Sequence, residues 1–168
     1  KKSGLGDYTF TIHAAELPFT GAIDGSQLYS EYAAKAGIKI KTVREPSDGF
    51  WTNVWRKKPF ITSRWSGRPT EDPMLTLAYG TGSTWNESYL SNPRLDDLLK
   101  AAPTEFDTEK RHQIYTECQQ IIRDEGGTVV PVFADFVDVA NDRVKFGERA
   151  SDWPLDGDRC AERWWFES

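Results

Sequence analysis

The chain has 168 residues and a net charge of −5, and it is polar for a globular protein, with 38% hydrophobic and 28% charged residues. Its nine Phe, seven Trp and six Tyr supply apolar surface for a core, which excludes a disordered chain. The acidic balance, without a basic stripe, makes nucleic acid and anionic membrane surfaces poor partners. No apolar run approaches the roughly 20 residues of a membrane helix.

The N-terminal part alternates between strand and helix patterns. Polar and apolar residues alternate over 8–14 and again over 38–45, which predicts two half-buried strands. Between them, an apolar face predicts a helix over 24–36, capped by Asp24 or Ser26 and ended by a glycine. The abrupt start of the first strand favours a piece of a longer chain. No signal peptide is recognised at the N-terminus.

A second helix and a third strand are expected next. Ser47 or Asp48 can cap a short helix that runs to residue 56, and residues 60–65 have a strand pattern. The order strand, helix, strand, helix, strand is typical of a parallel or mixed sheet with covering helices. The fold class expected is therefore α/β.

The remaining residues predict mainly helices. We expect a loop over 66–73, a linker over 80–92 and helices over 73–79, 94–102 and 108–125. Asp107 should cap the last of these helices, and Gly126 should end it.

A buried strand is expected over 129–134, and a further strand is possible over 136–140. Pro131 cannot donate to a ladder, so the first of these strands should lie at a sheet edge or be kinked there. The tail, 141–168, is tryptophan-rich and expected to be irregular.

Catalytic and metal-binding patterns are not found. No G-x-S-x-G elbow, P-loop or dinucleotide fingerprint occurs, and neither His13 nor His112 has a recognisable partner. No His or Cys pair has metal-ligand spacing, and no acidic pair can be singled out for glycoside hydrolysis. Cys118 is expected to be a small buried residue, although a disulfide with Cys160 stays open. We expect no cofactor, no metal and no enzymatic activity.

A candidate binding loop follows the predicted third strand. Ligands of open α/β sheets bind beyond the carboxyl ends of strands. Trp65 offers a flat apolar wall there, Gly67 allows close approach to the backbone, and Arg68 presents a planar fork for a carboxylate or phosphate. The alternative is that Trp65 is a core residue and that Arg68 pairs with Glu71 or Asp72 on the surface.

Three stretches carry a resemblance to a known family: a helix and strand over 28–43, the loop from Trp65 to Pro73, and a short helix, long helix and Pro-containing strand within 92–133. In these stretches the chain resembles the C-terminal part of the family 5 (peptide, opine and nickel type) solute-binding proteins of bacterial ABC importers. The resemblance covers about residues 8 to 140, with a tail similar to the family's C-terminus.

The resemblance implies a type II periplasmic-binding-protein lobe over 8–140, with a mixed sheet flanked by helices. The irregular tail, 141–168, would return to an N-terminal lobe outside this chain. It further implies a monomer, periplasmic or lipid-anchored at the cell surface, that closes on a small-molecule or peptide solute and delivers it to the transmembrane subunits of a permease.

One departure from the family bears on the solute. Peptide-binding members have an aspartate three residues after the loop tryptophan, where Arg68 stands here. An anion-bearing solute is therefore expected, such as an oligopeptide, an opine or a sugar derivative. The candidate ligand-binding residues are Trp65, Gly67, Arg68, Glu71 and Phe19. The alternative function is a carbohydrate-binding or glycoside-hydrolase-like domain.

Overall fold

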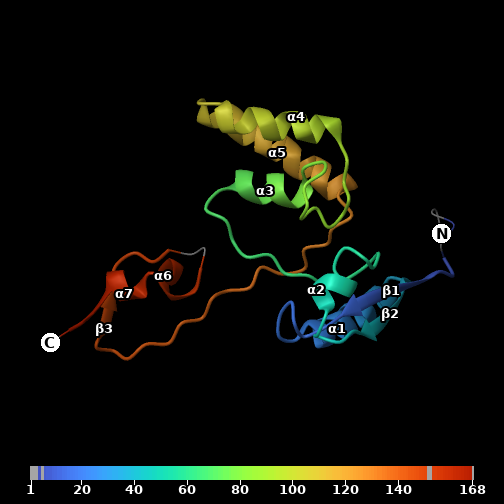
Figure 1. Cartoon of the computed structure of the whole chain (residues 1–168), viewed down its shortest axis with the longest axis horizontal. Helices are drawn as coiled ribbons and strands as arrows, with labels where there is room; N and C mark the ends of the chain where they lie inside the picture. The colour runs from blue at the N-terminus through green and yellow to red at the C-terminus, as the bar shows by residue number, and fades with distance from the viewer. Residues whose placement is uncertain (1–3, 5, 151–152, 168) are drawn as a thin grey trace. The chain divides into compact units, whose positions relative to one another are not determined.

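The computed structural model describes residue 4 and residues 6–150 and 153–167. The chain divides into two compact units, with the boundary in sequence between Trp65 and Ser66. Figure 1 shows the elements of both units, each of which is described by itself below. The predicted boundary at residue 140, between lobe and tail, stays a prediction.

The first unit contains a small parallel sheet. β1 (Thr9–Ala14) pairs with β2 (Lys39–Arg44) along its whole length, from Thr9 opposite Lys39 to Ala14 opposite Arg44. The predicted third strand over 60–65 is reduced to one parallel bridge between Ile61 and His13. Pro59 has no N–H to extend the ladder before this bridge.

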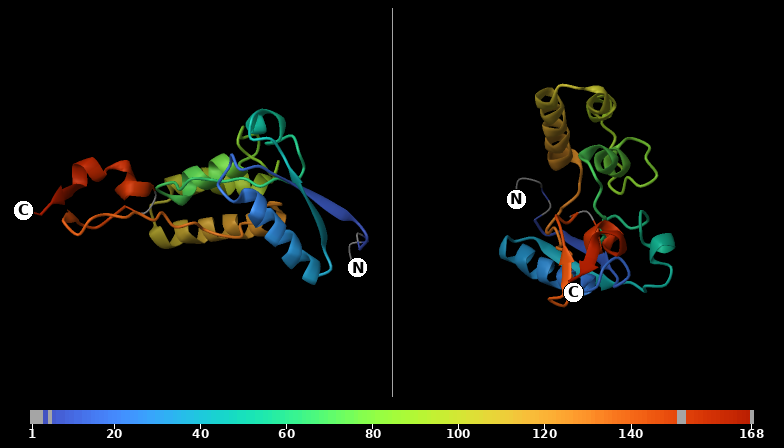
Figure 2. Two further views of the ribbon diagram at one scale, coloured as in Figure 1. Left: turned by 90° about the horizontal axis from the view of Figure 1, so that it is seen from below. Right: turned by 90° about the vertical axis from the view of Figure 1, so that its left-hand side faces the viewer.

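α1 (Ala22–Lys35) packs against both strands, as expected for a helix between two parallel strands (Figure 2). The helix begins earlier than predicted, after Gly21, whose left-handed φ of 86° turns the chain into it. Capping by Asp24 or Ser26 is therefore wrong. The Ser26 hydroxyl is buried and donates instead to the carbonyl of Ala22, at 2.7 Å.

α2 (Phe50–Asn53) is shorter than the predicted helix and begins after Gly49, so neither Ser47 nor Asp48 caps it. Phe50 is fully buried and forms a core cluster with Ala15 and Val54. Trp51 stays about half exposed, so the helix buries the phenylalanine before it rather than this tryptophan.

The second unit is built on helices: α3 (Glu71–Tyr79), α4 (Pro93–Ala101), the short η1 (Ala102–Thr104) and α5 (Thr108–Glu125). α3, α4 and α5 pack on one another around a core of Leu90, Leu95, Leu98, Leu99 and Cys118. The prediction of Asp107 as a cap is confirmed, because its carboxylate accepts the backbone N–H of Lys110 at 3.1 Å.

The strand predicted over 129–134 is wrong. After Gly126 the chain runs without a regular element to residue 141, drawn as a plain orange tube in Figures 1 and 2. A β-strand needs a neighbour for its backbone groups, and none of the described strands pairs with this segment.

The tail is more ordered than predicted. β3 (Val144–Phe146) and β4 (Trp164–Phe166) form a second, antiparallel sheet, separate from the first. Between them lie α6 (Pro154–Asp158), which contains left-handed residues, and α7 (Cys160–Arg163). Both sheets and the helices make the fold α/β, as predicted. No helix within the described residues has the length and apolarity to cross a membrane.

Candidate functional site

Arg68 is held by its own loop. Its Nη1 donates to the carbonyl oxygens of Ser66 at 3.0 Å and of Gly67 at 2.9 Å, and the side chain is half-buried. The alternative pairing with Glu71 or Asp72 is not among the ion pairs of the described residues. Nε and Nη2, which together form one edge of the guanidinium fork, are left without a partner in this part of the structure.

The two acids beside this loop belong to a helix. α3 begins at Glu71 rather than at residue 73, and Thr70 precedes it in extended backbone without a side-chain cap. Glu71 is exposed, and both it and Asp72 lie in the first turn, where the positive end of the helix dipole favours carboxylates. The helix terminus therefore compensates these charges.

The remaining predicted residues lie in loops. Phe19 follows β1, is partly exposed, and accepts the N–H of Ala22 through its carbonyl. Trp65 is half-buried and ends the first unit, while Gly67 is exposed in the second. Phe19 and Trp65 thus belong to one unit, and Gly67, Arg68 and Glu71 to the other. Their union in one site stays a prediction.

The carboxyl ends of β1 and β2 are tied together by a histidine and a glutamate. His13 Nδ1 lies 2.6 Å from Glu45 Oε1, and both side chains are largely buried. The N–H of Glu45 also donates to the carbonyl of Ala14. No partner for His13 could be recognised from the sequence, because the parallel register that brings residue 45 beside it is a tertiary feature.

A loop predicted as a linker, 80–92, is firmly organised around Asn86. This side chain is only 3% exposed, and its amide nitrogen donates to the carbonyls of Tyr79, Gly80 and Leu90. The loop presents Trp85 and Tyr89 as largely exposed aromatics, with Tyr89 at a left-handed φ of 55°. The placement of Asn86 between Ser83 and Ser88 is the sequence signal that could have revealed this turn.

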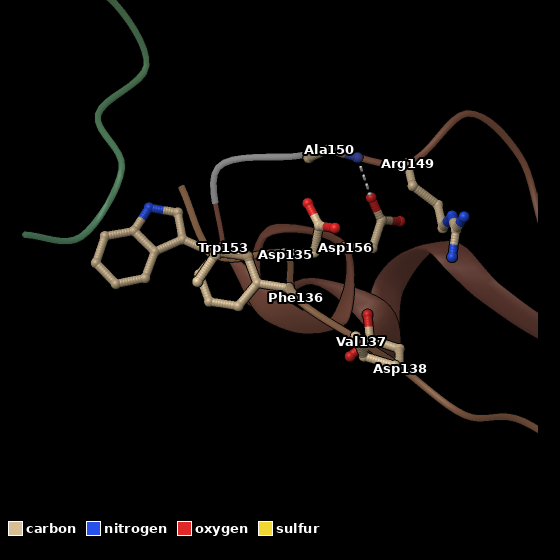
Figure 3. A pocket seen from close by; sticks show the side chains of 9 residues that line it. Asp135, Phe136, Val137, Asp138, Arg149, Ala150, Trp153 and Asp156 are labelled. Carbon is tan, nitrogen blue, oxygen red and sulfur yellow. Dashed lines mark hydrogen bonds between the residues drawn. The ribbon is translucent and has the colours of Figure 1, made fainter. Parts of the chain in front are cut away.

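An open pocket of about 690 Å³ lies in the C-terminal part of the second unit (Figure 3). It is lined by residues 134–138 and by Arg149, Ala150, Trp153 and Asp156. Sequence reasoning missed it, because its lining residues come from two segments with possible strand patterns, 129–134 and 136–140, and from a tail that was expected to be irregular.

Asp156 organises the pocket's inner wall. Its buried carboxylate accepts the N–H of Ala150 at 2.7 Å, Arg163 Nη1 at 2.8 Å and Trp164 Nε1 at 3.2 Å. The backbone N–H of Ala150 is the main reason that the pKa of Asp156 lies below its ordinary value, with the Arg163 charge adding to the effect. With its oxygens occupied, Asp156 holds the fold rather than a ligand.

Within the described part of the chain, no group of three or more His, Cys, Asp and Glu residues is placed to hold a metal ion. Cys118 and Cys160 are both free thiols. Burial raises the pKa of the Cys118 thiol, so this residue is a protonated core side chain, as predicted.

The structure is similar to solved solute-binding proteins. No family model matches the chain, and no curated protein matches it. AppA from Clostridium difficile matches with a TM-score of 0.62 and 22% identity, over 75% of this chain and 26% of that protein. The oligopeptide-binding protein AppA from Bacillus subtilis, solved with a nonapeptide, matches with a TM-score of 0.61 and 16% identity, over 96% of this chain and 32% of that protein. NikZ from Campylobacter jejuni, solved with Ni(L-His), matches with a TM-score of 0.60 and 16% identity, over 71% of this chain and 25% of that protein.

This chain therefore has the fold of part of these binding proteins, which is the fold that the resemblance in sequence implied. It spans between 25% and 32% of the length of these three proteins.

Proposed function

We propose that the chain is one lobe of a solute-binding protein that captures a small polar solute outside the cytoplasm and delivers it to an ABC permease. The fold carries this proposal, since the similar structures include binders of a nonapeptide and of Ni(L-His). The role is capture rather than catalysis. The intact protein would be a monomer, periplasmic or anchored to the cell surface by lipid, and its tail, 141–168, would return to the other lobe.

The solute is expected to carry an anionic group that Arg68 binds. The edge formed by Nε and Nη2 faces no acceptor among the described residues, while Nη1 is fixed by the carbonyls of Ser66 and Gly67. Such an edge accepts a carboxylate or phosphate through two parallel hydrogen bonds. Because Nη1 is already bound, the fork loses little freedom when the solute arrives.

Trp65, Gly67, Glu71 and Phe19 would complete the cleft. The half-buried Trp65 ring supplies an apolar wall, and the exposed Gly67 lets the solute approach the backbone. An acidic peptide, an opine or a phosphorylated sugar fits this set.

The test measures binding to the intact polypeptide that contains this chain. Free di- and tripeptides, N-acetylated acidic peptides, an opine and a sugar phosphate are titrated by calorimetry. Arg68→Ala is expected to weaken binding of the anionic ligand by about 10- to 150-fold, which corresponds to the 1.5–3 kcal/mol of hydrogen bonds to a charged group. The exposed Arg64→Ala is the matched control and should change little.

Two outcomes would contradict the proposal. Equal losses for Arg64→Ala and Arg68→Ala would show that only the general positive charge matters. Tight binding of free peptides with no effect of Arg68→Ala would keep the transport role and refute the anionic solute.

A further inference from the structure

His13 is the penultimate residue of β1, at the end of the sheet where both parallel strands finish. Glu45 follows β2 directly, and its backbone N–H donates to the carbonyl of Ala14, which fixes its place beside the end of β1. Ligands of open parallel sheets bind beyond this end of the strands. The two side chains therefore lie where a solute would meet the first unit.

The contact with Glu45 fixes the orientation of the His13 ring. Nδ1 lies 2.6 Å from Oε1 of Glu45, and the side chains of His13 and Glu45 are only 14% and 18% exposed. Because an ionised carboxylate can only accept, the proton at this contact is on Nδ1. Nε2, the other ring nitrogen, makes no hydrogen bond within the described residues and is not enclosed by protein atoms. The ring is thus held through one nitrogen and offers the other.

The chain that leads to Trp65 passes the same end of the sheet. The N–H of His13 donates to the carbonyl of Phe60 at 2.9 Å, and its carbonyl accepts the N–H of Thr62 at 3.0 Å. This bridge is parallel, so the chain continues from Thr62 toward the end where β1 finishes. Trp65 follows three residues later, at most about 11 Å along the chain. His13 thus shares one end of the first unit with the proposed apolar wall.

The charges around His13 leave room for an anion. On its face of the sheet, the charged side chains of β2 are the cations Lys39 and Lys41, which lie opposite neutral residues of β1. Residues 60–62 and α2 contribute no charge. Glu45 is the carboxylate in contact, and it is bound to Nδ1. An anion that arrives at Nε2 favours the imidazolium, which donates one N–H to Glu45 and the other to the anion.

We infer that His13 is a further binding residue, whose Nε2 donates a hydrogen bond to an anionic oxygen of the solute and takes up a proton from the buffer as the solute binds. The inference rests on the proposed function, which supplies the anionic solute, and extends it to a residue of the first unit. Glu45 is a positioning residue, because it orients the ring and compensates the charge of the imidazolium. Binding should therefore strengthen as pH falls toward the range in which histidine is charged.

NMR of the histidine-labelled intact polypeptide that contains this chain is the first test, at about pH 7.5. Inorganic phosphate, a sugar phosphate and an opine are added separately. At least one of them should move the ring signals of His13 toward those of an imidazolium. The ring of His112, which is exposed in α5, is the internal control and should not respond. If none of the anions moves the His13 signals, the inference is overturned, whatever Arg68 does.

Calorimetry in buffers of different ionisation enthalpy then counts the protons taken up. We expect about 0.5 proton or more per bound solute at about pH 7.5. His13→Gln should abolish this uptake and weaken binding about tenfold, the loss of one hydrogen bond to a charged group. His112→Gln is the matched control and should change neither quantity. Glu45→Gln, which keeps an acceptor for Nδ1 but removes the charge, should lower the uptake.

The proton count separates this inference from the role proposed for Arg68. Arg68→Ala should weaken binding and leave the uptake per bound solute unchanged. An Arg68→Ala variant that binds normally, with uptake intact, would refute the role of Arg68 and support that of His13. Binding without proton uptake, or uptake that persists in His13→Gln, would overturn the inference, because His13 would then only hold the ends of β1 and β2 together.

Discussion

Asn86→Ala should destabilise the helical part of the second unit strongly. The side chain is buried, donates to the carbonyls of Tyr79, Gly80 and Leu90, and accepts the hydroxyl of Ser88. Its two N–H groups serve three carbonyls, so one of them is shared. The substitution removes the equivalent of about three hydrogen bonds at about 1 kcal/mol each, which predicts a loss of about 3 kcal/mol.

The measurement is hydrogen exchange of the buried amides of α4 and α5, which reports the opening of this part alone. Asn53→Ala is the matched control, since Asn53 is exposed in α2 and its side chain makes no hydrogen bond within the described residues. The control should change the exchange free energy of α4 and α5 by less than about 0.5 kcal/mol. A loss below about 1 kcal/mol for Asn86→Ala would refute the reasoning, because ordinary net hydrogen-bond values would then overstate its contribution.

Two further predictions concern the second unit. The pKa of Asp156 lies below its unfolded value, so the contribution of its carboxylate to folding stability is complete above about pH 4 and is lost as pH falls through the folded pKa. The NMR signal of the Trp164 indole N–H, which donates to this carboxylate, should shift in this acid range. An unchanged signal would contradict the assignment. A disulfide reagent at neutral pH should modify Cys160 first and Cys118 only after unfolding. The reason is that Cys118 is fully buried and that burial raises the pKa of its thiol. Equal rates of modification of the two thiols would contradict this prediction.

Local patterns were sufficient for most of the helices and for two strands. The apolar stripe of α5 and its cap at Asp107 follow from residues within one or two turns of each other, and the sequence predicted both. The start of α1 was missed because Gly21, rather than Asp24 or Ser26, turns the chain into the helix. A left-handed glycine before a helix leaves no side-chain signature to distinguish it from an ordinary loop residue.

Strand pairing is the part that local pattern could not supply. The residues of 129–134 have the same β-branched and aromatic character as β1, and the pattern alone predicts a strand in both places. β1 finds β2 as a parallel neighbour, whereas 129–134 finds none within the described chain. For the same reason the contact between His13 and Glu45 was missed, because only the pairing of β1 and β2 brings these residues together. The loop around Arg68 was proposed from local residues alone, and its role as a site stays a prediction.

The charges around Arg68 are the reason that we propose an anionic solute for this loop. Had Arg68 paired with Glu71 or Asp72, an incoming carboxylate would have had to replace an existing partner of the same charge. The two acids instead lie in the first turn of α3, and Arg68 is anchored by neutral carbonyls. The half-buried guanidinium is thus hydrogen-bonded to neutral groups and forms no ion pair within the described residues. On the proposed binding, the remaining fork would gain a charge-assisted pair without breaking one, which is why we propose an anionic solute rather than the ammonium group that an aspartate would bind.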